Sequence, residues 1–471
     1  MVFSSLVFLL LFLPVTLAMY FLVPKRAKNA VLFFMSLVFY AWGEPVYIAI
    51  MLFSTVFDYC NGLALEKLKE KNEPKKQKAV LILSVVVNLG LLCFFKYTDF
   101  ALTTVNSAFN TSLQPLSIAL PIGISFYTFQ TLSYTIDVYR NRVKAQHNII
   151  SFGMYICMFP QLIAGPIVRY ADIEKQLDIN SRPFNSDKAS NGMLRFMLGI
   201  GKKVLLANTV GMLWEEISAL GGVSSACTSY LGTAAFMLQI YFDFSGYSDM
   251  AIGLAKILGF DLKENFDYPY MSKSVTEFWR RWHISLGVWF REYVYIPLGG
   301  NRKGLPRQIL NLFIVWFLTG LWHGAGWNFI LWGLYFFVLL VIEKLFLLRL
   351  LDRLPKLIGH IYTLLCVFFS WVIFANDDIT VLSEYVKSLF FKYGFCSADA
   401  RFYLMNFLAV FIAGILLSTP YPKKVFKLLL SRVKSEKARF ALKLALCVIV
   451  FAASFICIVS SGYNPFLYFR F

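Results

Sequence analysis

Apolar runs long enough to cross a lipid bilayer recur along the whole chain of 471 residues. A bilayer core about 30 Å thick requires about 20 apolar residues as a helix, because lipid offers no partner to an unpaired backbone group. The candidate spans, several of them shorter than a full crossing, are 2–23, 29–42, 45–64, 79–97, 116–138, 149–165, 191–214, 229–260, 308–322, 327–343, 358–375, 402–419 and 440–460. The sequence therefore predicts an all-α, polytopic integral membrane protein with about 11–13 transmembrane or re-entrant helices.

The apolar runs follow one another without a long polar stretch, which predicts one membrane-embedded domain over residues 1–471. The run at 149–165 is interrupted by Pro160 and Gly165, and Pro166 follows it. Short or broken helices are tolerated at membrane depth only where protein or a water-filled cavity covers them. We therefore expect the helices to surround a central funnel or tunnel.

Composition and charge exclude several other classes of protein. Hydrophobic residues make up 58% of the chain and charged residues only 15%, against about 25% charged in a soluble domain, so a soluble globule and a disordered chain are both excluded. The net charge of +18 includes basic clusters at 25–28, 67–78 and 140–144. These clusters occupy alternate short connections, which is typical of cytoplasmic loops. The pattern predicts a multi-pass protein in contact with membrane lipid, with its N-terminus outside, and argues against nucleic-acid binding.

His323 is the histidine that the sequence places deepest in the membrane. It lies in the hairpin between runs 308–322 and 327–343, whose far ends both carry basic residues typical of the cytoplasmic side. Helix from Gln308 to this position rises about 24 Å. An ionisable group at that depth suggests function, and an imidazole can accept a hydroxyl proton near neutral pH. Gly324 and Gly326 would let a substrate chain approach closely. The alternative is that His323 merely caps the helix end.

The segment 271–300 combines aromatic and basic residues and is the predicted interfacial part of the site. Its large apolar residues recur at the spacing of one helix face: Trp279, Trp282, Leu286, Trp289, Phe290 and Tyr293. One amphipathic helix lying in the membrane interface is the simplest interpretation. His283 lies beside that stripe. Because guanidinium groups bind phosphate oxygens in pairs, a phosphate-bearing molecule could dock from the cytoplasm against Arg280, Arg281 and Arg291.

Other motifs of catalysis or metal binding find no support in the chain. Residues 199–203 lack the earlier glycine and the following Ser or Thr of a phosphate loop, and the patterns HExxH, CxxC and GxSxG do not occur. No metal site and no permanently bound cofactor are expected. Asp243 and Asp249 lie in an apolar run, where carboxylates facing lipid would be costly. We expect them to meet polar partners in a structural role, and His147 and His360 to be interface residues.

Several motifs, taken in order, resemble the membrane-bound O-acyltransferase superfamily. They are the residues 278–286, the residues 289–300 and the Trp-His-Gly motif 322–324. The branch that the chain most resembles is the membrane subunit of bacterial alginate O-acetyltransferase, on the motifs 160–167, 241–253 and 464–471. The D-alanyl transfer subunit of teichoic acid modification is a close relative that shares both histidine motifs. The resemblance runs nearly end to end.

The resemblance implies an activity and a set of partners. It implies a membrane-bound O-acyltransferase of the bacterial cell membrane, in which helices surround a funnel, acetyl-CoA enters from the cytoplasm and the acceptor arrives from outside. His323 would be catalytic and His283 an important second residue. The acceptor would be a hydroxyl on an extracytoplasmic, hydrolase-like acetyltransferase, which passes the acetyl group to a polysaccharide.

These expectations assign a role to each candidate residue. His323 would be the general base for the acceptor hydroxyl, while His283 and the three arginines would hold the thioester end and its phosphates. Trp279 and Trp282 would contribute to substrate or cofactor binding. Trp322, Trp327 and Asn328 would line the site and orient His323, although core packing is the simpler role for the two tryptophans.

Three other functions fit parts of the pattern. The first is D-alanyl transfer to teichoic acid from a carrier protein. The second is a proton-coupled transporter that uses His323 as a proton relay, although no inverted repeat is visible in the sequence. The third is a scaffold that anchors a secreted polymer-modifying enzyme, in which case neither histidine would be needed for function.

Overall fold

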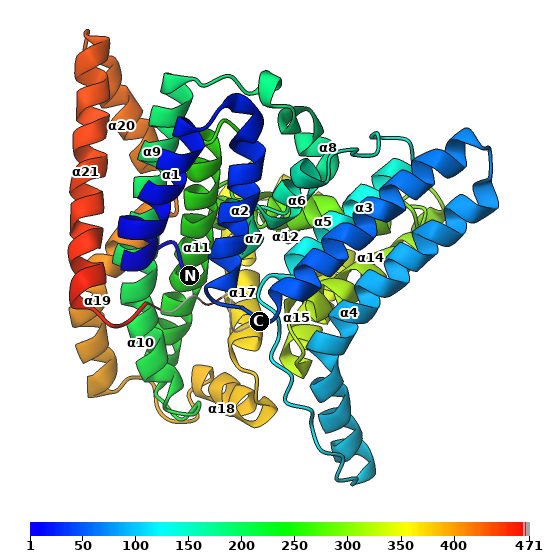
Figure 1. Ribbon diagram of the computed structural model, residues 1–471. Helices are drawn as coiled ribbons and strands as arrows, with labels where there is room; N and C mark the ends of the chain where they lie inside the picture. Colours follow the sequence, from blue (N-terminus) through cyan, green and yellow to red (C-terminus); the bar gives the residue numbers. More distant parts are fainter. Residues whose placement is uncertain (465–466, 468–471) are drawn as a thin grey trace. The chain divides into compact units, whose positions relative to one another are not determined.

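The computed structural model describes residues 1–464 and 467, and in this range the chain forms helices and no β-strand. The C-terminal motif 464–471 therefore lies largely outside the described residues. The helices shown in Figure 1 are α1 (Leu13–Leu22), α2 (Lys28–Ala41), α3 (Ile48–Glu70), α4 (Pro74–Phe109), α5 (Ile124–Tyr139), α6 (Ile149–Cys157), α7 (Phe159–Leu162), α8 (Tyr170–Ile173), α9 (Ser186–Gly201), α10 (Asn208–Ser218), α11 (Ala226–Ile257), α12 (Val275–Arg281), α13 (Ile284–Phe290), α14 (Gly304–His323), α15 (Trp327–Ile342), α16 (Leu348–Arg353), α17 (Lys356–Ala375), α18 (Ile379–Leu389), α19 (Ala398–Leu417), α20 (Tyr421–Ser431) and α21 (Glu436–Ser460). Short 3-10 and π segments flank or join them: η1 (Phe8–Phe12), η2 (Lys25–Ala27), η3 (Glu174–Leu177), η4 (Ile179–Ser181), η5 (Lys202–Ala207), η6 (Pro269–Met271), η7 (Arg291–Tyr295) and η8 (Glu343–Leu347).

Eight helices in the described part of the chain are long and apolar enough to cross a membrane, which confirms the predicted all-α membrane architecture. They are Ile48–Glu70, Pro74–Phe109, Ser186–Ser218, Gly304–His323, Trp327–Arg353, Lys356–Ala375, Ala398–Leu417 and Glu436–Ser460. Other predicted spans form shorter helices, such as α2 with 14 residues and α5 with 16. The predicted break in 149–165 is confirmed, because α6 ends at Cys157 and α7 covers only four residues. The central funnel stays a prediction.

Contacts divide the chain into two compact units, 1–196 with 250–263 and 197–249 with 264–471. The predicted single domain stays a prediction. In the first unit, α3, α4 and α5 pack together around the carboxylate of Asp58, which is fully buried. Ser84 Oγ and Asn88 Nδ2 of α4 donate hydrogen bonds to it at 2.6 and 2.7 Å. Such bonds offset the cost of a charge inside a membrane bundle and hold the helices in register.

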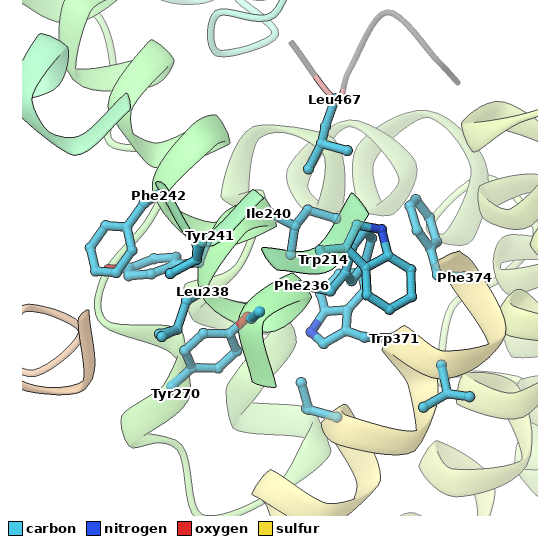
Figure 2. Close-up of a cluster of buried hydrophobic side chains, with 14 of the residues drawn as sticks. Trp214, Phe236, Leu238, Ile240, Tyr241, Phe242, Tyr270, Trp371, Phe374 and Leu467 are labelled. Atoms are coloured by element: carbon cyan, nitrogen blue, oxygen red, sulfur yellow. The ribbon is translucent and has the colours of Figure 1, made fainter. Parts of the chain in front are cut away.

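The second unit contains an aromatic core formed largely by α10, α11 and α17 (Figure 2). Trp214 of α10 packs against Phe236 of α11, with ring centroids 5.1 Å apart, and Trp371 of α17 packs against Phe374 at 5.4 Å. Large aromatic rings bury much apolar surface with few rotatable bonds, so such a core is well defined in position. The core extends to Trp282 and Trp332, which lie beside the two histidines of the candidate site.

Asp243 and Asp249 of α11 form ion pairs, which agrees with the structural role expected for them. Lys203 Nζ lies 2.7 Å from Asp243 Oδ1, and both side chains are buried. Lys202 Nζ lies 2.6 Å from Asp249 Oδ2 in a more exposed position. Both lysines belong to η5, inside the continuous helical stretch 186–218. The two lysines that resemble part of a phosphate loop therefore neutralise carboxylates in the same unit.

Candidate functional site

His323 is the last residue of α14, and aromatic rings surround it on several helices. Its imidazole contacts Trp332 of α15 and Phe374 of α17, with ring centroids 4.8 and 5.5 Å away. Only 7% of the residue is exposed. The helix ends there because Gly324 adopts an extended backbone, with φ −171° and ψ 162°. The predicted hairpin is confirmed, and His323 lies at its tip in an enclosed site.

The glycines of this hairpin serve packing, which corrects the expectation that Gly324 and Gly326 leave room for a substrate chain. A Cβ on Gly324 would lie 2.1 Å from the ring of Phe329, and one on Gly326 would lie 2.5 Å from Asn328 Oδ1. The hairpin's own side chains therefore fill that space.

His283 interrupts the helix that the sequence predicts, and the expectation of one continuous amphipathic helix is wrong. Its φ of 42° and ψ of 53° place the backbone in the left-handed region between α12 and α13. Non-glycine residues adopt this conformation at a cost and only where the surroundings hold them. Backbone bonds to the preceding segment supply that support, with Ile284 N donating to Asn265 O at 3.0 Å. The aromatic periodicity led to a wrong prediction because helical spacing does not show where a helix is interrupted by a sharp change of chain direction.

The aromatic stripe packs largely inside the second unit. Trp282 is 2% exposed, and its ring centroid lies 5.1 Å from that of Trp371. Trp279 packs against Trp316 at 4.7 Å and Trp332 at 5.5 Å. The interfacial location of this segment stays a prediction. A contact of Trp279 or Trp282 with substrate stays a prediction.

Trp322 joins the two histidines. Its ring centroid lies 5.7 Å from that of His283 and 5.1 Å from that of His323. The two imidazoles, which are 40 positions apart in the printed sequence, therefore belong to one site. Trp322 is 4% exposed, so its role as a wall of the site agrees with its position. Trp327, by contrast, is 47% exposed.

Asn328 acts on the site through the backbone of α17. Its Nδ2 donates a hydrogen bond of 3.0 Å to the carbonyl oxygen of Phe374, and the ring of Phe374 contacts His323. Orientation of His323 by Asn328 stays a prediction. Through this bond Asn328 fixes an aromatic neighbour of the histidine.

The predicted phosphate-binding arginines are in different environments. Arg281 is committed to Glu277, with Nη2 and Oε1 2.8 Å apart, and it lies 3.7 Å from Asp267 Oδ2. Arg280 and Arg291 are exposed. Of these three arginines, Arg280 and Arg291 are therefore the accessible ones, whereas Arg281 neutralises carboxylates.

Asn265 is a site residue that the sequence analysis missed. Its Oδ1 lies 3.2 Å from Nδ1 of His283 and accepts bonds from the backbone N–H of Ser285 at 3.1 Å and from Ser285 Oγ at 2.8 Å. No local motif marks this asparagine, because it comes from a polar connection that only the fold brings to the histidine. Burial lowers the pKa of His283 to about 3 from its ordinary value of 6.5, so the imidazole is neutral at cellular pH.

Glu343 is a second residue that the sequence analysis missed. Its carboxylate is fully buried and accepts bonds from the N–H groups of Val275 and Thr276 at 2.6 and 2.8 Å, and from Thr276 Oγ1 at 2.6 Å. A carboxylate at this place binds the unpaired amides of a helix start. Glu343 therefore fastens the start of α12, whose other end leads into His283. A pattern of Ser274 with Glu277, typical of a helix start, could have located the beginning of α12.

No group of three or more His, Cys, Asp or Glu side chains within residues 1–464 and 467 is gathered so that it could hold a metal ion. The site places two imidazoles in a largely buried aromatic environment. Such an environment strengthens each polar interaction because water is largely excluded.

Sequence comparisons agree with this arrangement. Residues 223–386, which include both histidines, match the profile of MBOAT, the membrane-bound O-acyltransferase family. The chain is 43% identical to the probable alginate O-acetylase AlgI of Pseudomonas aeruginosa over 394 residues, which cover 83% of this chain and 75% of that protein. It is 33% identical to a peptidoglycan O-acetyltransferase of Helicobacter pylori over 83% of this chain and 80% of that protein. It is also 28% identical to a teichoic acid D-alanyltransferase of Bacillus subtilis over 48% of this chain and 59% of that protein.

The apolar helices, the buried histidine pair and these matches together define an integral-membrane acyl-transfer enzyme. The chain belongs to the membrane-bound O-acyltransferase family. It is accordingly a multi-pass membrane O-acyltransferase.

Proposed function

We propose that this enzyme transfers an acetyl group from cytoplasmic acetyl-CoA across the membrane to a hydroxyl group on the outer side. The observation that carries the proposal is the enclosure of His323 by Trp322, Trp332 and Phe374 at the end of a membrane-crossing helix. The names of the alginate and peptidoglycan relatives support acetyl as the acyl group and a polysaccharide as the final acceptor.

His323 would act as the general base. Its imidazole removes the proton of the acceptor hydroxyl while that oxygen attacks the thioester carbonyl carbon, and the carbon–sulfur bond then breaks. The CoA thiolate leaves and takes up the proton held on the imidazole, so the products are an O-acetyl ester and free CoA. A positioned base of this kind typically contributes about 10²- to 10⁴-fold in rate.

The direction of transfer follows from the proposed topology. The connections 25–28, 67–78 and 140–144 are basic, which favours a cytoplasmic location for these loops. Because the first apolar run precedes the first of them, the N-terminus would lie outside the cell. Arg280 and Arg291 are exposed and are the side chains available for the phosphates of CoA. The hydroxyl would belong to an extracytoplasmic, hydrolase-like acetyltransferase, which would pass the acetyl group to a polysaccharide.

The experiment measures transfer of radiolabelled acetyl from acetyl-CoA in membranes that contain the wild type or His323→Ala, with the extracytoplasmic partner of the same organism supplied. His360→Ala is the matched control, because His360 Nδ1 lies 3.2 Å from the backbone oxygen of Ser272, outside the group of rings around His323. We expect label on the partner or polysaccharide with the wild type and the control, and loss of label with His323→Ala. Full transfer by His323→Ala would overturn the catalytic assignment.

A second candidate is D-alanyl transfer, which the teichoic acid relative favours. The same membranes distinguish the two activities by their donor. Absence of acetyl transfer by the folded wild type, together with transfer of D-alanine from a charged carrier protein, would replace the acetyl proposal.

A further inference from the structure

The corner between α12 and α13 presents His283 in one defined orientation. Its left-handed backbone is fixed by the bond from Ile284 N to Asn265 O and by the bond from Asp267 N to Arg281 O, at 3.0 and 2.9 Å. The ring packs edge-on against Phe244, with centroids 4.7 Å apart and an interplanar angle of 85°. The imidazole therefore has little freedom to exchange the positions of its two nitrogens.

The partners of Asn265 determine which nitrogen of His283 carries the proton. The backbone N–H of Ser285 can only donate, so the Asn265 atom that it contacts at 3.1 Å is the amide oxygen. The amide nitrogen points elsewhere, towards Ser248 Oγ at 3.3 Å. The same oxygen lies 3.2 Å from Nδ1 of His283. An oxygen without hydrogen can only accept, so Nδ1 donates in this contact. Ser285 Oγ lies 3.5 Å from Nδ1, but its single proton is donated to the same Asn265 oxygen at 2.8 Å.

The other nitrogen of the neutral ring, Nε2, then has a lone pair. His283 is 1% exposed, and its Nε2 has no hydrogen-bond partner within residues 1–464 and 467. A buried polar atom without a partner is costly, and such atoms in folded proteins often mark a place where another molecule binds. The ring of Phe244, which packs edge-on against the imidazole, has no N–H or O–H group to donate to Nε2.

We propose that Asn265 fixes His283 as the Nδ1–H tautomer, so that Nε2 accepts a hydrogen bond from an N–H or O–H group of a bound substrate. This inference rests on the proposed acyl transfer, in which two such donors occur: the amide N–H groups of the pantetheine arm of the acyl donor and the hydroxyl of the acceptor. Asn265 is a positioning residue here. In this tautomer His283 cannot donate a hydrogen bond to the thioester carbonyl.

Two charged groups of the neighbouring helices are paired, whereas Arg280 of α12 is exposed. On α11, Asp249 is bound to Lys202, and on the segment before the corner Arg281 is bound to Glu277. Glu264 and Asp267 lie beside Asn265 in the sequence. The lowered pKa of His283 is caused by burial of its ring. The neutral state of the imidazole thus depends on burial, and a carboxylate at position 265 would change it.

The tautomer can be tested without any assumption about activity. The chain has only four histidines, so ¹⁵N spectra of histidine-labelled protein can be assigned with single substitutions. For His283 we expect a proton on Nδ1 and none on Nε2 in the wild type. A proton on Nε2 in that spectrum would overturn the assignment, even if acetyl transfer is confirmed.

Substitutions then test the acceptor role of Nε2. The amide of His283→Gln can reach the position of Nε2, whereas that of His283→Asn reaches only the position of Nδ1, although asparagine adopts the left-handed backbone more readily. We expect kcat/KM to stay within about tenfold of wild type for His283→Gln and to fall by more than about a hundredfold for His283→Asn. Equal losses in both variants, with both folded, would contradict the proposal.

Asn265→Asp provides a readout that a merely structural residue would not give. A carboxylate that accepts the Nδ1 proton favours imidazolium and raises the pKa of His283, so Nε2 becomes protonated as the pH falls. We expect the acidic limb of the pH–activity profile of this variant to lie at higher pH than that of the wild type. Superimposable pH profiles would exclude tautomer control by Asn265.

A CoA-binding measurement identifies which group donates the hydrogen bond to Nε2. Titration of CoA into purified full-length His283→Phe should show weaker binding if Nε2 accepts from the pantetheine arm. Unchanged CoA affinity with a lower kcat would identify the acceptor hydroxyl as the donor. Unchanged CoA affinity together with unchanged kcat and KM would refute the contact altogether. If the wild type transfers no acetyl group, the proposed function fails, while the spectra still decide the tautomer.

Discussion

His283 and His323 both contact the indole ring of Trp322, with ring centroids 5.7 and 5.1 Å from it. The separation of the two imidazoles is therefore smaller than the sum of those distances, and one rigid side chain sets their relative position. This relationship makes Trp322 the spacer of the candidate active site.

We expect Trp322→Ala to lower kcat more than it raises KM, because removing the ring frees both histidines and leaves a cavity between them. Transfer rates measured at saturating concentrations of the acyl donor test this prediction. Trp214→Phe is the control, since Trp214 is buried in the same unit but packs against Phe236 and Tyr385. A control that loses as much kcat as Trp322→Ala would point to general loosening of the core.

Glu343→Ala should destabilise the protein by about 2 kcal/mol or more, because it leaves the buried N–H groups of Val275 and Thr276 without their charged acceptor. Glu277→Ala breaks a partly exposed contact with Arg281 and should cost no more than about 1 kcal/mol. Thermal unfolding in detergent compares the two variants. Similar midpoints would show that Glu343 does not hold α12.

Lys203→Met should cost about 3–5 kcal/mol of stability, since it leaves the buried carboxylate of Asp243 unpaired. The neighbouring pair offers a matched comparison, because Lys202 binds Asp249 at a more exposed position. Lys202→Met should therefore cost much less. Chemical denaturation of both variants provides the measurement, and the reverse order of stabilities would contradict the burial argument.

Gly333→Ala should disrupt the helix pair α14–α15, because the new Cβ would lie 2.4 Å from the backbone oxygen of Trp316. The helices would have to move apart, and His323 at the end of α14 would move with them. Gly90→Ala is the control: no atom lies within 4 Å of its added Cβ, and alanine stabilises a helix interior by about 0.5–1 kcal/mol. We expect Gly333→Ala to lower both activity and melting temperature. Gly90→Ala should raise the melting temperature and leave activity intact.

Acid should weaken the fold in part through His283. The unfolded imidazole takes up a proton below pH 6.5, whereas burial lowers its folded pKa to about 3. Stability is therefore lost as the pH falls between these values, by up to about 1.4 kcal/mol per pH unit for this group. His283→Gln removes that dependence, so the difference in melting temperature between pH 7.5 and 5 should be smaller in the variant. An equal difference in both proteins would rule out this contribution.

Long apolar runs were reliable predictors because each helix in lipid must satisfy its own backbone bonds. The spans 327–343 and 402–419 match α15 and α19 within a few residues at each end. The ends of other runs were predicted less accurately. The run 116–138 begins as a helix only at Ile124, because the preceding residues have no regular structure, and α4 extends well past the predicted 79–97.

The sequence by itself determined the membrane architecture, the hairpin that carries His323 and the presence of a second histidine segment, because these depend on local hydrophobicity and on nearby residues. Only the tertiary structure decided that the chain turns a corner at His283, that Asn265 and Glu343 support that corner, and that Trp322 joins both imidazoles. Each of these contacts joins separate segments of the chain. Helical periodicity contains no information about such distant partners. The free-energy cost of the left-handed backbone at His283 is offset only by the contacts that these partners make.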